Sequence, residues 1–280
     1  MSRRVTLSAS LWRVLLVGLT LVYAIPLYLV VTLSLKSDAQ TARAPFAPPW
    51  QPYWANYLEA WNASAASGNA SLAPALFNSA LIAILSVLVL VVSGAMAGYV
   101  LARRKGRAVE WVFLLFLVGI TVPQQLGIVP LFQMMRSFGL VGNPLGLVLM
   151  NTGLLAPLTI FLYTTFIRSL PTDFEEAALM DGASRLRVFW DVVMPLVRPV
   201  TATVIVIHGM HVWNDFFTPL IFLLGSGKQT LPVAIFSLVG EYSTSWGPIF
   251  AGVVIASIPV MTVFVFLQRH IVRGFSGGIR

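Results

Sequence analysis

Six apolar stretches, each about as long as a membrane is thick, constrain this chain more than any other feature. A hydrocarbon core of about 30 Å takes roughly 20 helical residues at about 1.5 Å each. Backbone groups in lipid must pair within their own segment, so each stretch predicts a helix. The short alternating segments of a transmembrane barrel are absent from the sequence. We predict an all-α integral membrane protein, one domain over residues 1–280, with helices at about 14–35, 76–101, 111–135, 145–167, 199–224 and 248–267.

The composition excludes a soluble globule. Hydrophobic residues make up 58% of the chain and charged residues 10%, against roughly 45–50% and about 25% in soluble domains. The same figures exclude intrinsic disorder and a coiled coil. Because the chain has no cysteine, a disulfide framework, a thiolate metal site and a cysteine nucleophile are excluded as well.

The basic residues predict how the chain is oriented. Most of the 18 Lys and Arg residues fall at the two termini and in two loops, near residues 103–107 and 168–198. The positive-inside rule places these segments, and therefore both termini, in the cytoplasm. The high isoelectric point then reflects topology rather than nucleic-acid binding. A twin-arginine look-alike at residues 2–7 precedes an apolar run that is too long for a signal peptide, so we expect a retained membrane anchor.

The predicted cytoplasmic loop at about 169–198 holds half of the acidic residues. Thr172 followed by Glu175 predicts a capping box at the start of a short helix near Asp173, and Gly182 suits the end of that helix. Ser184 predicts the cap of a second helix that ends at Pro195. Its apolar residues share one face at i, i+3, i+4 and i+7: Leu186, Phe189, Trp190 and Val193.

This helix pair has the character of a knob that fits a groove in a partner. Ala177 and Ala178 allow close approach, Phe174 and Met180 are apolar anchors, and Glu176 can meet an arginine. Capping and amphipathicity alone favour a solvated connector between two membrane helices, so this alternative stays open on those grounds.

The loop resembles the EAA loop of the permease subunits of ABC importers. Residues 176–183 read EAALMDGA, and Val192 and Met194-Pro195 follow at the family's spacing, with Val192 in place of the usual isoleucine and Met194 in place of the usual leucine. The resemblance covers nearly the whole chain and is strongest to the MalG-like subunits of carbohydrate importers. Further matching motifs lie at residues 56–57, 60–61, 78–79, 213–216, 268–269 and 272–274.

The resemblance implies a MetI-like fold in a bacterial or archaeal cytoplasmic membrane. It implies a MalF-like second permease, two ATP-binding subunits that hold ATP and Mg, and an extracytoplasmic solute-binding protein. This chain would then bind no cofactor and would not itself be an enzyme. Its loop at about 225–247 would reach the solute-binding protein, and its tail from Gly274 to Arg280 would enter between the ATPase subunits. The implied ATPase-coupling residues are Phe174, Glu176, Ala177, Ala178, Met180, Asp181 and Gly182.

Asp215 is the one carboxylate within a predicted span, which makes it a candidate for lining the transport pathway. Trp213 could stack on a sugar and Asn214 could bind its hydroxyl groups. The alternative is a buried polar cluster that fixes helix packing. His208 and His211 lie one turn apart, but no further ligand completes a metal site, and we predict none.

Two other classes of protein remain as alternatives. A stand-alone secondary transporter or channel needs its own coupling charges and usually an inverted repeat, whereas this chain has Asp215 and no visible repeat. A membrane-embedded enzyme needs a paired carboxylate, a nucleophile with its base, or a metal set, and the predicted spans contain none. Neither the transported sugar or polyol nor the host follows from the sequence.

Overall fold

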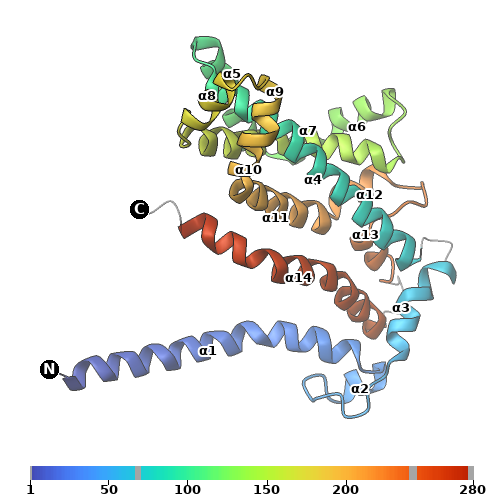
Figure 1. Cartoon of the computed structure of the whole chain (residues 1–280). Helices are drawn as coiled ribbons and strands as arrows, with labels where there is room; N and C mark the ends of the chain where they lie inside the picture. Colours follow the sequence, from blue (N-terminus) through green and yellow to red (C-terminus); the bar gives the residue numbers. More distant parts are fainter. Residues whose placement is uncertain (1, 67–70, 240–244, 277–280) are drawn as a thin grey trace. The chain divides into compact units, whose positions relative to one another are not determined.

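A computed structural model describes residues 2–66, 71–239 and 245–276, and every regular element in these ranges is helical (Figure 1). The chain forms two compact units, one of residues 1–73 with 234–258 and one of residues 74–233 with 259–280. Parts of the two predicted partner-binding segments, residues 240–244 and 277–280, lie outside the described residues.

The helical elements, in chain order, are α1 (Ser2–Ser34), α2 (Asp38–Arg43), α3 (Ala55–Ala66), α4 (Leu72–Arg103), α5 (Arg107–Thr121), η1 (Gln124–Gly127), α6 (Ile128–Ser137), α7 (Pro144–Arg168), α8 (Asp173–Met180), α9 (Arg185–Arg187), η2 (Val188–Val193), α10 (Met194–Leu196), α11 (Arg198–Asn214), α12 (Phe217–Phe222), α13 (Leu231–Phe236) and α14 (Trp246–Ser276).

Four of the six predicted membrane helices are confirmed as long apolar helices. Among the described residues, α1, α4, α7 and α14 each contain a stretch long and apolar enough to cross a bilayer. Two bent helix pairs raise the number to six if each pair counts as one span. The fold class is therefore an all-α membrane protein with four to six apolar spans.

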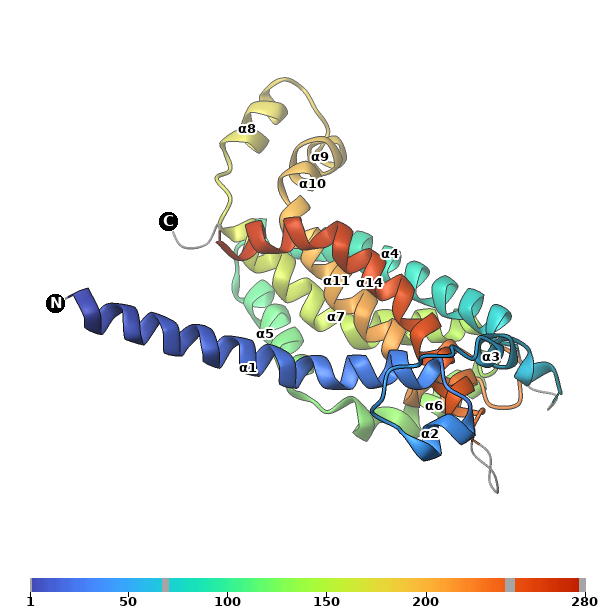
Figure 2. The same ribbon diagram turned by 90° about the horizontal axis from the view of Figure 1, so that it is seen from below.

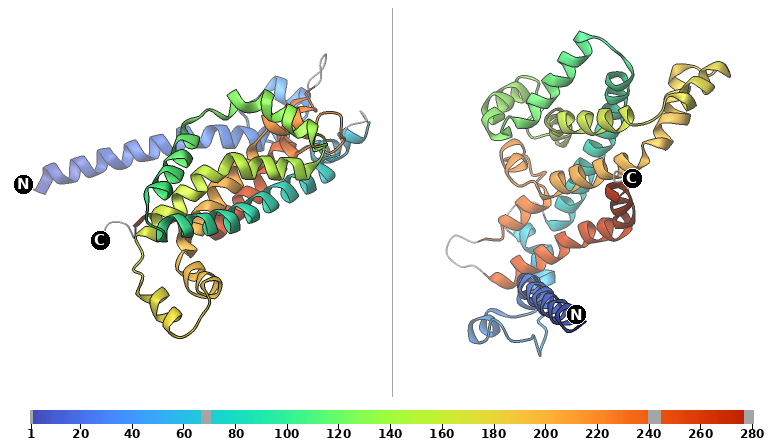
Figure 3. Two further views of the ribbon diagram at one scale, coloured as in Figure 1. Left: turned by 90° about the horizontal axis from the view of Figure 1, so that it is seen from above. Right: turned by 90° about the vertical axis from the view of Figure 1, so that its left-hand side faces the viewer.

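The helix predicted at 111–135 is broken near its middle. The chain forms α5, then turns by 96° and continues through η1 and α6 (Figure 3). Pro123 explains the break, because the residue before a proline is pushed out of the helical region, and Val122 is extended at φ −74°, ψ 122°. Such a bend cannot be recognised from hydropathy, because the segments on both sides of it are hydrophobic.

The predicted continuous helix at 199–224 is also wrong. Helix α11 ends at Asn214, Asp215 is extended at φ −68°, ψ 120°, and α12 begins two residues later. Asp215 Oδ1 accepts a hydrogen bond from the backbone N–H of Thr218 at 3.2 Å. The carboxylate that the sequence placed inside a span therefore lies at a break between two helices, where it satisfies an otherwise unpaired N–H.

Helix α4 packs closely on α7 in the larger unit, at Gly94 and Gly98. A Cβ at Gly98 would lie 2.6 Å from the Cβ of Tyr163, and one at Gly94 would collide with the methyl group of Thr159. Tyr163 is fully buried at this contact. Small residues thus let two apolar helices approach closely, which is the main source of attraction between helices in lipid.

A buried polar pair adds specificity to the same core. Nε2 of His208 lies 2.9 Å from Oγ1 of Thr159, whose hydroxyl also donates to the carbonyl of Leu155 at 2.9 Å. His208 is buried while His211 is exposed. The two histidines therefore point into different surroundings, and among the described residues no group of three metal-binding side chains gathers.

The smaller unit is built around Asn56. Its side-chain amide donates to the carbonyls of Ser34 and Lys36, at 2.9 and 2.8 Å, and so closes the end of α1. Gly247 lies directly against this amide, where a Cβ would collide with it. The loop between α1 and α4 contains α2 and α3. A capping box of Ser37 and Gln40 begins α2, and the sequence analysis missed it.

Candidate functional site

The segment that resembles the EAA loop forms a helical hairpin that projects from the end of the larger unit (Figure 2). Its first helix, α8, ends in a Schellman motif. The N–H of Gly182 donates to the carbonyl of Leu179 and the N–H of Ala183 to that of Ala178, each at 3.0 Å. Gly182 has φ +84°, a conformation that favours glycine, which confirms its predicted capping role. Ser184 also caps the next helix as predicted, because its side chain accepts from the N–H of Arg187.

The predicted capping box at the start of α8 is wrong. The side chain of Thr172 makes no capping hydrogen bond, and Glu175 turns away from the helix end toward α4. The Oε1 atom of Glu175 lies 2.6 Å from Nη2 and 2.9 Å from Nε of Arg103, and Oε2 accepts from the hydroxyl of Tyr99 at 3.0 Å. Two charge-assisted hydrogen bonds from an arginine are stronger than one from a backbone N–H, so the carboxylate of Glu175 pairs with Arg103.

Two arginines make reciprocal contacts between the ends of α4 and α7. Arg103, at the end of α4, also donates to the carbonyl of Leu170 at 3.3 Å. Arg168, at the end of α7, donates to the carbonyl of Leu101 at 3.3 Å and lies 4.6 Å above the ring of Phe113. Each guanidinium thus satisfies a backbone carbonyl at the end of the neighbouring helix, Leu101 in the last turn of α4 and Leu170 just after α7. Some of the arginines that the sequence explained by topology are therefore also structural links.

Helix α8 has an inner and an outer face. Glu175 is 7% exposed, and Ala178 packs against the buried cluster that includes Phe189 and Val193. The outer face carries Phe174, which is 58% exposed, and Met180, which is 88% exposed. Of the seven residues implied for ATPase coupling, Ala178 faces inward and the six others are exposed: Phe174, Glu176, Ala177, Met180, Asp181 and Gly182.

The second arm of the hairpin is not a regular α-helix. Residues 188–193 form the π-helix η2, which widens the turn. Phe189 and Val193 are buried as predicted, but Leu186 is 60% exposed and Trp190 is 42% exposed. A spacing rule for 3.6 residues per turn misassigns this face because the π-turn inserts an extra residue. The arm and α11 meet at a bend of 75°, with Pro195 just before it.

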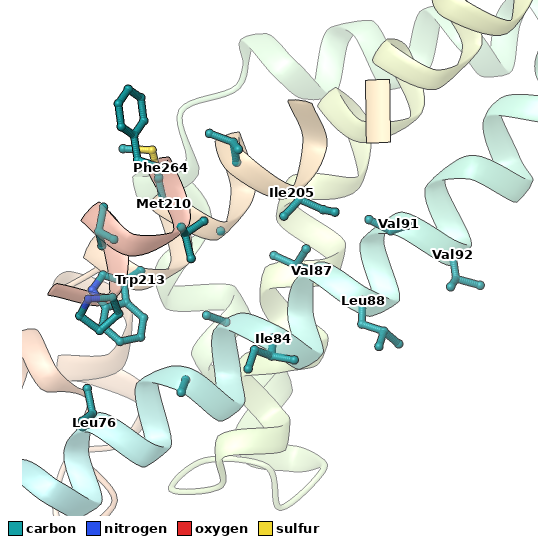
Figure 4. A pocket seen from close by; sticks show the side chains of 17 residues that line it. Leu76, Ile84, Val87, Leu88, Val91, Val92, Ile205, Met210, Trp213 and Phe264 are labelled. Atoms are coloured by element: carbon teal, nitrogen blue, oxygen red, sulfur yellow. The ribbon is translucent and has the colours of Figure 1, made fainter. Parts of the chain in front are cut away.

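The candidate pathway residues occupy three different surroundings. Trp213 lines an apolar cavity of about 730 Å³ between α4, α11 and the second half of α14, together with Ile84, Val87, Met210 and Phe264 (Figure 4). Asn214 is exposed at the end of α11 and donates to the carbonyl of Met210 at 2.8 Å. Asp215 caps the break described above. The structure therefore does not gather these three side chains on the wall of this cavity.

Comparison with known proteins places the chain among import permeases. It is 34% identical to the melibiose/raffinose/stachyose import permease protein MelC of Bacillus subtilis, over 91% of this chain and 90% of that protein. It is 32% identical to the diacetylchitobiose uptake system permease protein NgcG of Streptomyces coelicolor, over 96% of this chain and 88% of that protein.

A solved structure and a family match agree with these relatives. The fold matches a chain of a bacterial ABC transporter involved in the import of the acidic polysaccharide alginate, with a TM-score of 0.83 and 22% identity over 96% of this chain and 98% of that chain. The family described as binding-protein-dependent transport system inner membrane component matches residues 91–277, which contain both the α4–α7 core and the α8 hairpin. This chain belongs to the family of inner membrane components of binding-protein-dependent transport systems.

Proposed function

We propose that this chain is a permease subunit of an ATP-driven carbohydrate importer, and that α8 transmits the motion of an ATP-binding subunit to the membrane helices. The observation that carries the proposal is the position of α8: its outer face is open while its inner face is fastened to α4 through Glu175 and Arg103. Relatives named for melibiose, raffinose, stachyose and diacetylchitobiose support an oligosaccharide as the substrate class.

The outer face of α8 supplies the docking contact. Phe174 and Met180 are exposed apolar anchors beside the exposed carboxylate of Glu176. An exposed aromatic ring and a flexible thioether in one short helix fit a hydrophobic cleft, and the carboxylate selects a basic residue at its rim. The expected partner is therefore a cleft with an apolar floor and a positive edge on an ATP-binding subunit.

The inner face supplies the mechanical link. A helix without further contacts could move freely on its flanking loops. In α8, two hydrogen bonds from Arg103 and one from the Tyr99 hydroxyl hold the carboxylate of Glu175 to α4. A force applied at Met180 reaches α4 through this link. From α4 it passes into α7 through the glycine contacts at Gly94 and Gly98. Closure of the ATPase pair would thus change the packing of the spans as a unit, a switch between discrete arrangements.

The other subunits of the proposed transporter are those typical of the family. A second, related permease completes the pathway, two ATP-binding subunits bind and hydrolyse ATP with Mg, and a solute-binding protein delivers the sugar. Both termini and the α8 hairpin face the cytoplasm of the host, according to the distribution of basic residues. In this arrangement the chain itself carries no catalytic group.

Trp213 and Asn214 are the candidates for sugar contact on this subunit. The indole of Trp213 is an aromatic surface of the kind that packs on a sugar ring. Asn214 is a separate candidate, because its side chain is exposed and its oxygen can accept from a hydroxyl group. Asp215 acts on the same region indirectly, because it sets the break at which α11 gives way to α12.

The test is a pull-down of the tagged chain in mild detergent, together with sugar uptake and sugar-stimulated ATPase activity of the complex in liposomes. We expect an ATP-binding subunit and a second permease to co-purify, and Glu176→Lys to abolish uptake. The matched control is Glu110→Lys, because Glu110 is also an exposed carboxylate in the first turn of a helix on the predicted cytoplasmic side.

Two outcomes contradict the proposal. Normal uptake in the Glu176→Lys variant removes the docking role of α8. Solute transport by the purified chain alone, without ATP-binding subunits, supports the stand-alone transporter instead.

A further inference from the structure

Residues 44–54, which we call the aromatic loop, form an uncharged surface beside the end of α1. The loop reads APFAPPWQPYW, so it combines four aromatic residues and four prolines without a single charge. Phe46 is 71% exposed, Trp50 is 85% exposed and Trp54 is 65% exposed. An aqueous loop of this length normally carries polar side chains, so this exposed surface needs an apolar or interfacial neighbour.

Side chains satisfy the carbonyls of the loop. Nζ of Lys36 donates to the carbonyls of Ala44 and Pro45, at 2.7 and 3.0 Å, and the hydroxyl of Tyr28 donates to the carbonyl of Phe46 at 3.0 Å. Three consecutive carbonyls thus have donors from the protein. Water satisfies loop carbonyls without such help, whereas a carbonyl near lipid must find a partner within the chain.

The hydrogen bond from Tyr28 fixes the depth of the loop. Tyr28 lies within the apolar stretch Leu11–Ser34, six residues before the end of α1, which corresponds to about 9 Å along the helix axis. The stretch itself is longer than the roughly 20 residues that cross the hydrocarbon core. Phe46 therefore lies beside α1 near the outer edge of that core, where Trp and Tyr side chains are enriched.

The loop is held in this position by further contacts with its own unit. The N–H of Tyr53 donates to the carbonyl of Leu35 at 2.9 Å, and the side chain of Gln40 donates to the carbonyl of Gln51 at 3.2 Å. Lys36 is 3% exposed, and burial lowers the pKa of its amine because the charged form loses hydration. The aromatic side chains are thus presented outward by a braced backbone, not by a free coil.

We propose that the aromatic loop inserts into the interface of the outer leaflet and anchors the extracytoplasmic end of α1 to lipid. The loop has no charge with which to select a protein surface, and its exposed rings continue the exposed apolar surface of α1 at Leu27 and Val31. The aromatic rings would pack among headgroups and the first acyl carbons, while the prolines have no backbone N–H that would need an acceptor there.

The absence of cysteine from the sequence allows a direct test. A nitroxide label on Gln51→Cys leaves every aromatic residue in place, because only the backbone carbonyl of Gln51 is engaged. The assembled complex is placed in liposomes of phosphatidylethanolamine and phosphatidylglycerol, and the collision rates of the label with oxygen and with a nickel chelate are compared. References are Leu21→Cys, on the exposed side of α1, and Lys228→Cys, in an exposed turn.

We expect the oxygen-to-nickel ratio at Gln51 to lie between the two references, and Phe46→Ser with Trp50→Ser to shift it to the Lys228 value. Trp50→Phe should leave the ratio unchanged, because a phenyl ring still partitions into the interface. A ratio equal to that of Lys228 in the unsubstituted complex overturns the proposal. So does a label that only the added solute-binding protein protects, since the loop would then be a protein-docking surface.

Discussion

Nη2 of Arg103 lies 2.6 Å from Oε1 of Glu175, and this ion pair joins the last turn of α4 to the first turn of α8. Glu175 immediately precedes the EAA motif, which begins at Glu176. The two neighbouring carboxylates have different surroundings. Glu176 is exposed, and Glu175 is buried against the chain's own arginine. A coupling element needs both, because a helix that docks without being fastened transmits no force.

Loss of this pair should uncouple the importer without dismantling it. Glu175→Gln keeps the shape and a hydrogen bond to Tyr99 but removes the charge, so we expect the ATP-binding subunits to co-purify while sugar-stimulated ATPase activity and uptake fall together. Arg103→Gln should destabilise more, by up to about 3–5 kcal/mol, because it leaves the carboxylate buried without its counter-ion. The double variant should recover part of that loss, which a double-mutant cycle of thermal unfolding measures. Full uptake in both single variants would show that the pair is dispensable.

The contact of α4 with α7 should tolerate no side chain at Gly98. We expect Gly98→Leu to lower the free energy of unfolding by about 1–3 kcal/mol or to prevent folding, because the new side chain meets the Cβ of Tyr163. Gly153→Ala is the matched control, since a Cβ at Gly153 in α7 meets nothing within 4 Å. Thermal unfolding in detergent compares the two variants, and equal stability would contradict the close packing.

Asn56 should be needed to hold the end of α1 at Ser34. Asn56→Ala leaves the carbonyls of Ser34 and Lys36 without their donor, and we expect a loss of about 1–3 kcal/mol for the buried groups. Asn62→Ala, at an exposed position on the same helix, should change little. Proteolysis of the segment from Ser34 to Trp54 reports the local opening. Equal protection from proteolysis in the two variants would contradict the role of Asn56 in holding the end of α1.

The role of Asp215 can be separated into charge and capping. Asp215→Asn keeps an oxygen that accepts from the N–H of Thr218, so uptake should remain near normal, whereas Asp215→Ala removes the cap at a cost of about 1 kcal/mol. We expect uptake to fall mainly in the alanine variant. A large loss of uptake in the asparagine variant with unchanged assembly would instead indicate that the charge itself acts in the transport pathway.

The sequence by itself determined the membrane class, four of the helices and the helix ends at Gly182 and Ser184. Lipid requires every span to have a minimum length and an apolar composition. The sequences of α1, α4, α7 and α14 meet both requirements. The sequence also predicted the role of Gly182, because a helix commonly ends at a glycine with a backbone conformation that disfavours other residues.

Tertiary structure alone decided which partner each polar group found. Glu175 had an adequate local partner at the start of its own helix, yet it paired with Arg103, which is distant in sequence. The sequence predicted Asp215 to be an intramembrane charge because the segments around it are mostly apolar, and the bend that brings it to Thr218 cannot be recognised from hydropathy. Local spacing predicts what a residue can do, whereas the choice among competing partners depends on which groups the packed helices bring within hydrogen-bond distance.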